Sequence, residues 1–239
     1  MEGAFEETWF YAPLADTGGK ALLPEEESNH LLKVLRVRPG RRIVVTNGEG
    51  GVFLCDTRPA GKGLEVEAVE VLRREPNPPR LHLVLGLLKG RDSEEPVEGV
   101  CQLAVAGIHL VTTDHTQEFK GQDHARLLER LRHKSLVALK QAKKSWLTEV
   151  HAPVTLREWR RSHPGPLVVA HPGPDRLPEK GTGPLYVLVG PEGGFSGEET
   201  EWLFGAEGAF NLGLGGTRIR GTHAPLVACG KLMGLGLCG

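Results

Sequence analysis

The chain has 239 residues, with 29 Lys or Arg and 30 Asp or Glu, so its formal net charge is −1. This balance excludes a generally basic nucleic-acid binder, and any RNA affinity must come from local clusters of positive charge. The length suits one large or two small domains with a hydrophobic core. Four scattered cysteines predict reduced thiols, with no zinc site and no disulfide framework.

The N-terminal third has short apolar runs separated by turn residues. From Trp9 to about Arg74, period-two alternation is interrupted by Asn47–Gly51 and Pro59–Gly63, which is typical of strands joined by hairpins. We therefore predict a small antiparallel β-barrel over residues 1–74. Three prolines then predict a stiff linker at residues 75–80.

A basic cluster lies within the predicted barrel, in a run of ten residues without an acid. Its members are Lys33, Arg36, Arg38, Arg41 and Arg42. Such a cluster can follow a phosphate backbone, or it can be a solvated turn on the barrel surface. Both interpretations remain open.

Residues 81–239 alternate between continuous apolar runs and helical segments. Strands are expected at Leu81–Leu88, Ile108–Thr112 and Leu167–Ala170, and helices at Glu94–Ala106 and Asp123–Trp146. This alternation predicts a parallel sheet with helices on both faces, which is an α/β fold. No run of about eighteen apolar residues and no signal peptide is present, so we predict a cytoplasmic protein without a membrane segment.

The long helix predicted at Asp123–Trp146 has an apolar stripe and a basic opposite face. The stripe consists of Leu128, Leu131, Ser135, Leu139, Ala142 and Trp146. Seven Lys or Arg against one acid, Glu129, favour nucleic-acid binding by this face, and a solvated face is the alternative. The candidate RNA-binding residues are Arg126, Arg130, Lys140 and Lys144.

Two glycine-rich loops follow predicted strands near the C-terminus. The apolar run Leu185–Val189 ends in Gly-Pro-Glu-Gly-Gly-Phe-Ser at 190–196, and acidic helix formers follow. A second loop with two arginines lies within Asn211–Pro225, before a helix start that we expect Thr222 to cap. Because ligands bind at the carboxyl ends of parallel strands, we expect the site at these loops. For the first loop alone, a plain connection between a strand and a helix is the alternative.

These segments resemble the RsmE family of SPOUT methyltransferases, which methylate N3 of a uridine in small-subunit ribosomal RNA. The resemblance runs over the whole length. Asn29–Gly40 and Asn47–Gly50 are similar to the N-terminal signature, Lys89–Glu94 and Gln102–Val105 to the middle blocks, and the loop at 190–196 matches completely.

The second loop departs from the family pattern Leu-Gly-x-Arg-Ile-Leu-Arg-Thr-Glu-Thr-Ala-Pro. It keeps Arg220, but Thr217, Gly221, Thr222 and His223 stand where the family has Arg, Thr, Glu and Thr. Because the threonines supply neither a cation nor a carboxylate, we expect slow transfer by family standards. The alternatives are an RNA-binding protein of the same fold without transferase activity, and a metabolic enzyme that binds another nucleotide.

The resemblance implies a SPOUT-type domain with a trefoil knot, preceded by a PUA-like RNA-binding β-barrel. It also implies S-adenosylmethionine (AdoMet) as the cofactor without a metal, a homodimer, and small-subunit ribosomal RNA or the assembled subunit as the partner. By position, the cofactor would be held by Ala170, His171, Gly190, Glu192, Gly193, Gly194, Leu212, Leu214 and Gly215. Arg220 would stabilise negative charge on the uracil, and His223 is a candidate acceptor of the N3 proton.

Overall fold

The computed structural model of the protein describes all residues except 1–3, 37–39, 90–91, 117–123, 206 and 239. The chain forms two compact units. The first comprises Met1–Pro78 and Leu136–Leu147, and the second comprises Pro79–Ser135 and Thr148–Gly239. None of the helices within the described ranges has the length and apolar character needed to span a membrane. The four cysteines are free thiols.

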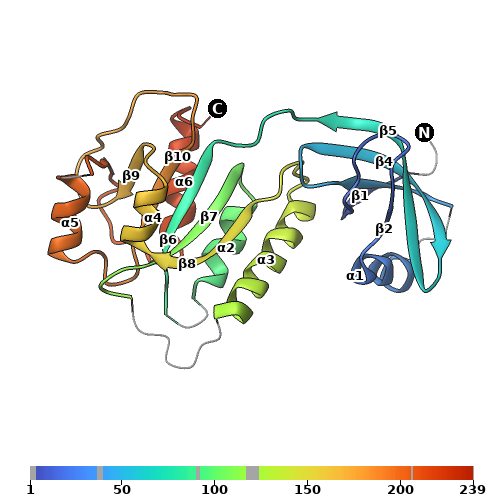
Figure 1. Cartoon of the computed structure of the whole chain (residues 1–239), viewed down its shortest axis with the longest axis horizontal. Helices are drawn as coiled ribbons and strands as arrows, with labels where there is room; N and C mark the ends of the chain where they lie inside the picture. Colours follow the sequence, from blue (N-terminus) through green and yellow to red (C-terminus); the bar gives the residue numbers. More distant parts are fainter. Residues whose placement is uncertain (1–3, 37–39, 90–91, 117–123, 206, 239) are drawn as a thin grey trace. The chain divides into compact units, whose positions relative to one another are not determined.

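The first unit contains a five-stranded sheet in the order β1-β3-β4-β5-β2 (Figure 1). Its strands are β1 (Ala4–Tyr11), β2 (Lys20–Leu22), β3 (Arg42–Thr46), β4 (Gly51–Ala60) and β5 (Gly63–Arg74). Four strands pair antiparallel as predicted, whereas β1 runs parallel to β3. The chain between these two strands is long enough for a crossover, which a parallel pair requires.

The turn that Asn47-Gly48 predicted lies between β3 and β4, and the Asn47 side chain stabilises it. The side-chain oxygen of Asn47 accepts hydrogen bonds from the backbone N–H groups of Glu49 and Gly51, at 2.8 and 2.9 Å. Gly48 and Gly50 have φ angles of 73° and 90°, which only glycine adopts without strain. Local chemistry therefore determines this turn.

Two short helical segments lie between β2 and β3. They are α1 (Glu25–Asn29) and the π-helical turn η1 (His30–Val34). Leu31 of η1 is fully buried and joins the hydrophobic core of this unit with Phe10 and Phe53. The basic residues that follow Leu31 obscured this segment in the sequence.

The second unit is built on a six-stranded sheet in the order β11-β9-β10-β6-β7-β8, in which every neighbouring pair is parallel (Figure 1). The strands are β6 (Leu81–Gly86), β7 (Val105–Thr112), β8 (Glu149–Thr155), β9 (Leu167–Ala170), β10 (Leu185–Val189) and β11 (Phe210–Leu212). All five residues of β10 are buried, as expected for a strand covered on both faces. The predicted parallel sheet is confirmed.

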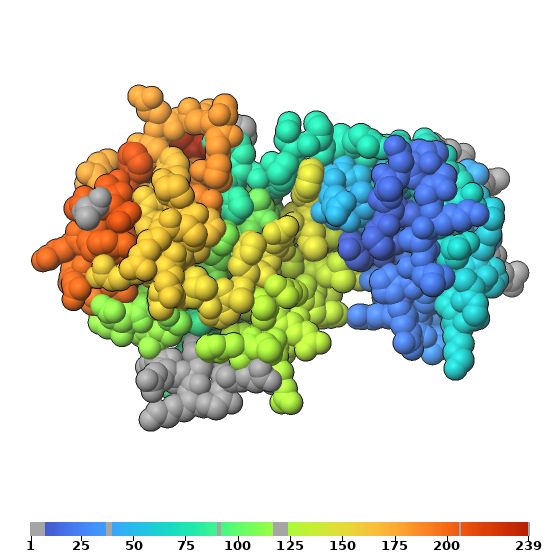
Figure 2. Space-filling view, viewed as in Figure 1, coloured from blue at the N-terminus to red at the C-terminus, as the bar shows by residue number. Residues whose placement is uncertain are grey.

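Helices cover both faces of this sheet. They are α2 (Glu94–Cys101), α3 (His124–Gln141), α4 (Leu156–Ser162), α5 (Gly197–Phe204) and α6 (Ala224–Gly234). α6 packs against α2, β6 and β10, whereas Trp159 of α4 and Leu203 of α5 share a core on the sheet with Leu188. β8 and α4, yellow in Figure 2, lie on the visible surface.

Two predicted helix ends and one residue of a predicted core stripe in this half were wrong. Helix α2 ends at Cys101 rather than Ala106, because the residues from Val105 onward form β7. Helix α3 ends at Gln141 rather than Trp146, and Lys143 just beyond it has a positive φ of 52°. The core stripe of α3 includes Leu127 rather than Leu128, which is only half-buried.

β8 and α4 were missed altogether. β8 is an edge strand whose residues are mostly exposed, so it has no continuous apolar run. α4 begins with a capping box, in which Thr155 caps the helix and Glu158 bonds back to the Thr155 backbone N–H. This Ser/Thr-x-x-Glu pattern could have identified the helix from the sequence.

Four histidines cluster on the α4 side of the sheet. His109 Nε2 lies 3.2 Å from His82 Nδ1, and the His109 ring stacks on His151 with centroids 4.3 Å apart. His163 meets the His109 ring edge-on at 4.8 Å. Burial, then repulsion from neighbouring histidines, lowers the pKa of His82 to about 4 and that of His109 to about 3.

This cluster should make the folded state sensitive to acid. Below about pH 6.5 the unfolded chain binds protons that the folded protein excludes, so the free energy of unfolding falls as the pH drops from neutral through the lowered pKa values. Urea unfolding at pH 7 and pH 5 should show a smaller fall for His109→Gln than for the wild type. Equal falls in both proteins would contradict a role for His109.

Candidate functional site

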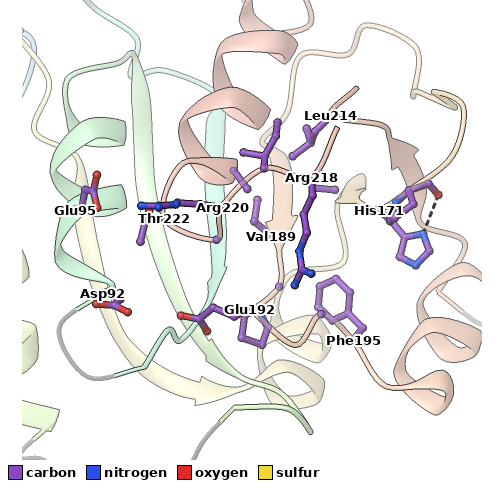
Figure 3. A pocket seen from close by; sticks show the side chains of 18 residues that line it. Asp92, Glu95, His171, Val189, Glu192, Phe195, Leu214, Arg218, Arg220 and Thr222 are labelled. Atoms are coloured by element: carbon purple, nitrogen blue, oxygen red, sulfur yellow. Dashed lines mark hydrogen bonds between the residues drawn. The ribbon is translucent and has the colours of Figure 1, made fainter. Parts of the chain in front are cut away.

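The loops after β9, β10 and β11 converge at the carboxyl ends of these parallel strands. Together with α2 and the start of α6 they enclose a cavity of about 870 Å³ (Figure 3). The predicted residues that line it are Ala170, His171, Gly190, Glu192, Gly194, Leu214 and Arg220. The structure thus brings together residues from three separate segments at the predicted edge of the sheet.

The loop after β10 is held in a compact turn. The backbone N–H of Gly194 donates to the Pro191 carbonyl at 2.8 Å, and Gly194 has a φ of +68°. Ser196 then caps α5 in a capping box with Glu199. The loop passes close over β6, because a Cβ added to Gly86 would lie 2.7 Å from Pro191 Cδ. A larger residue at position 86 would displace this loop.

Three of the predicted cofactor-binding residues do not line the cavity. Leu212 is fully buried in β11, and Gly215 lies outside the lining although its φ is +115°. The Gly193 carbonyl faces His115, and a Cβ added to Gly193 would lie 3.1 Å from His115 Cβ. A valine at position 193 would therefore press on His115, rather than on a ligand in the cavity.

An ion pair anchors the loop after β11. Lys231 Nζ of α6 lies 2.7 Å from an Asp175 carboxylate oxygen and donates to the Gly213 carbonyl at 2.7 Å. Asp175 also accepts from the Gly213 backbone N–H at 2.9 Å. The Lys231 ammonium holds the pKa of Asp175 below its usual value. These bonds place Leu214 at the cavity wall.

Charged side chains divide the cavity into two sides. The Arg220 side chain extends toward Glu95, and Arg218 extends between Glu192 and Phe195 (Figure 3). Asp92 and Glu192 carry further carboxylates near the α2 side. Val189, Leu214 and Phe195 supply apolar surface on the side where Arg218 lies.

His223 lies at the N-cap of α6, where the sequence predicted Thr222. Neither side chain caps this helix, because no capping hydrogen bond is made and Pro225 occupies its first turn instead. His223 is not among the residues that line the cavity, and its Nε2 lies 3.4 Å from Oε1 of the lining residue Glu95. His223 therefore reaches the site through Glu95.

Several lining residues were not predicted. Asp92 and Glu95 follow β6, Phe195 belongs to the first glycine-rich loop, and Arg218 is the other arginine of the second loop. Asp92 and Glu95 could have been identified from the sequence, because they follow the carboxyl end of the central strand β6 and such positions face ligands. Within the described residues, no three His, Cys, Asp or Glu side chains are arranged to hold a metal ion.

The basic residues proposed for RNA binding fall into two groups. Lys33, Arg36 and Arg41 of the barrel are exposed, Arg42 pairs with Asp56 at 3.0 Å, and Arg38 lies outside the described residues.

On α3, Arg126 is exposed and Lys144, just past the helix end, is half-buried. Arg130 pairs with Glu94 at 2.9 Å, and Lys140 pairs with the buried Glu27. Acids distant in the sequence therefore neutralise part of the apparent excess charge of α3.

Known proteins resemble this chain over nearly its whole length. An RNA methyltransferase domain matches residues 75–233, and an RNA methyltransferase PUA domain matches residues 23–62. The chain is 28% identical to a ribosomal RNA small subunit methyltransferase E of Mycobacterium bovis, over 92% of this chain and 88% of the relative. A relative of the same name from Synechocystis is 26% identical, over 89% of this chain and 72% of the relative.

Two solved structures share the fold. A methyltransferase from Legionella pneumophila, in complex with bound SAM, has a TM-score of 0.82 at 25% identity and covers 95% of this chain and 97% of its own. A ribosomal RNA small subunit methyltransferase E from Neisseria gonorrhoeae has a TM-score of 0.81 at 24% identity, with the same coverage. With a family domain matched over roughly two thirds of its length, the chain belongs to the RNA methyltransferases, within the RsmE family.

Proposed function

We propose that the protein transfers a methyl group from AdoMet to N3 of a uridine in small-subunit ribosomal RNA. The observation that carries this proposal is the cavity at the ends of β9, β10 and β11, which holds Arg220 within a member of the RsmE family. The names of the relatives support the ribosomal substrate, and the Legionella structure with bound SAM supports the cofactor.

The residues present fit AdoMet. The cavity volume lies within the range of about 300 to 1,000 Å³ that small-molecule sites have. Val189, Leu214 and Phe195 would enclose the adenine, and the carboxylates of Asp92 and Glu192 suit the positively charged part of the ligand. When bound, AdoMet supplies a methyl group on a cationic sulfur, which is already an activated donor.

The protein's task is then to place the uracil and stabilise its charge. Loss of the N3 proton spreads negative charge onto O2 and O4, and a guanidinium remains protonated and offers several hydrogen-bond donors. We assign this role to Arg220, which lines the cavity. We assign the N3 proton to the Glu95–His223 pair, in which the Glu95 carboxylate, which lines the cavity, accepts the proton and His223, 3.4 Å away, takes it on from Glu95.

Residues of the cavity also replace the charges that the second loop lacks relative to the family pattern. The carboxylate that position 222 lacks is present in the cavity on Glu95 of α2, and the cation that position 217 lacks is present on Arg218. We therefore propose that α2 supplies the missing carboxylate and the neighbouring Arg218 the missing cation, and that transfer is faster than the altered loop predicts.

RNA binding by the barrel should depend on its exposed basic residues. Replacing Lys33, Arg36 and Arg41 by Glu should weaken RNA binding and reduce the slope of log K against log salt by roughly 0.7 to 0.9 for each phosphate that the protein no longer neutralises. Lys62→Glu, in the exposed β4–β5 turn, is the matched control. Fluorescence titrations with ribosomal RNA at several salt concentrations measure the slope. An unchanged slope in the triple variant would mean that the cluster is only solvated.

The assembly and the knot belong to the same proposal. Family resemblance supports a homodimer and a trefoil knot formed by the last strands and α6, and action on ribosomal RNA supports a cytoplasmic location. Sedimentation of the purified protein tests the dimer. A monomer at micromolar concentration would contradict it.

The enzyme activity is tested with tritiated AdoMet and two substrates, protein-free small-subunit RNA and assembled subunits. We expect label in 3-methyluridine after nuclease digestion of one of them. Calorimetry in parallel should show AdoMet binding at concentrations below about 1 mM, where even a −4 kcal/mol interaction registers. Binding of AdoMet and RNA without transfer to either substrate would instead favour an RNA-binding protein of the same fold.

A further inference from the structure

Residues 113–116, which follow β7, form a compact turn that we term the β7 turn. The Thr113 backbone N–H donates to Thr116 Oγ1 at 2.8 Å, and the Thr116 backbone N–H donates to the Thr113 carbonyl at 3.0 Å. These bonds hold the two residues between them, Asp114 and His115, in a defined position. Both side chains are exposed at the protein surface.

The β7 turn is bonded to the loop after β10 at Gly193, and beyond it to Ser196 and Glu199, the capping box of α5. Ser196 Oγ donates to Asp114 Oδ2 at 2.5 Å, and the Asp114 backbone N–H donates to Glu199 Oε1 at 3.0 Å. His115 Nδ1 lies 2.9 Å from the Gly193 carbonyl oxygen. Because a carbonyl oxygen only accepts, Nδ1 of His115 carries the hydrogen and donates it.

A hydrogen bond to the Gly193 carbonyl can fix the backbone of the residues that line the cavity. Gly193 itself does not line the cavity, but its neighbours Glu192 and Gly194 do. Glycines have more conformational freedom than other residues, and a single backbone hydrogen bond, from Gly194 to Pro191, closes this turn from within. The hydrogen bond that His115 donates from outside the loop therefore reduces the conformational entropy that the loop would lose when a ligand binds.

We infer that His115 is a positioning residue, which fixes the backbone of Glu192 and Gly194 toward the cavity by holding the Gly193 carbonyl, and so strengthens cofactor binding. The inference rests on the proposed AdoMet site. The absence of a side chain at Gly193 is part of the same arrangement, since a Cβ there would lie 3.1 Å from His115 Cβ. Asp114 secures the end of the loop by accepting from Ser196.

Two variants isolate the hydrogen bond from the bulk of the side chain. In His115→Asn the amide nitrogen takes the place of Nδ1 and can still donate to Gly193, whereas His115→Leu has nearly the same shape as the asparagine variant and no donor. Calorimetry should give an AdoMet Kd about 3- to 10-fold weaker for His115→Leu and within about twofold of wild type for His115→Asn, as expected for one exposed hydrogen bond. Turnover at saturating AdoMet should change less than KM.

A second measurement needs no cofactor. Amide hydrogen exchange at Gly194, whose N–H closes the turn, should be faster in His115→Leu than in the wild type and the asparagine variant, with the unfolding midpoint unchanged in all three. If the wild type binds AdoMet, and both variants have the same Kd and the same exchange rate as each other, this inference alone is overturned. A wild type that does not bind AdoMet would overturn the proposed cofactor as well.

Discussion

Arg220→Ala should lower methyl-transfer turnover by roughly 10²- to 10³-fold, the magnitude found when a donor to a developing oxyanion is removed. The guanidinium lines the cavity and is assigned to the negative charge that develops on the uracil, so its loss acts on the transition state rather than on cofactor binding. The AdoMet Kd, measured by calorimetry, should stay within about threefold of the wild-type value.

Arg157→Ala is the matched control for this experiment. Arg157 lies on α4, pairs with Glu198 at 3.1 Å and does not line the cavity, so its removal should leave single-turnover methylation unchanged. Turnover of Arg220→Ala close to that of the wild type would remove Arg220 from the proposed chemistry. A parallel loss of AdoMet affinity would make it a cofactor-binding residue instead.

Gly194→Val should weaken AdoMet binding by at least about 100-fold. Gly194 lines the cavity with a φ of +68°, and a β-branched residue is strained in that conformation, so the turn that shapes the cavity wall must rearrange. A Cβ at Gly194 would meet no protein atom within 4 Å, so the added methyl groups would lie in open space beside the lining. Titration calorimetry measures the effect.

Gly197→Ala is the control for the glycine variant, because Gly197 is the first residue of α5, lies outside the cavity lining and has open space at its Cβ. It should bind AdoMet normally. Thermal unfolding of both variants shows that each is folded. Normal binding by a folded Gly194→Val would mean that the loop after β10 is not part of the cofactor site.

Much of the site region could be predicted from the sequence, because the relevant signals are local. The run Leu185–Val189 became β10 without a change of boundary, since five consecutive apolar residues followed at once by a glycine-rich loop suit a short strand covered on both faces. Ser196 and Glu199 are close enough in the chain to form the capping box that starts α5. The sequence also predicted the Asn47 turn, the parallel sheet and the edge of the sheet at which the cavity lies.

The rest depended on contacts between residues that are distant in the chain. Whether Arg130 and Lys140 are available to RNA is decided by Glu94 and Glu27, which lie 36 and 113 residues away. Nothing near Gly193 shows that its carbonyl meets His115, 78 residues earlier.

Local sequence therefore determined β10, the Asn47 turn, the start of α5 and the two glycine-rich loops, because hydrogen bonding and burial within a few residues suffice for them. Only the tertiary structure decided which loop residues line the cavity, and that Glu95 reaches His223 there. The physical reason is that ion pairs and loop contacts form between segments that only the folded sheet brings together.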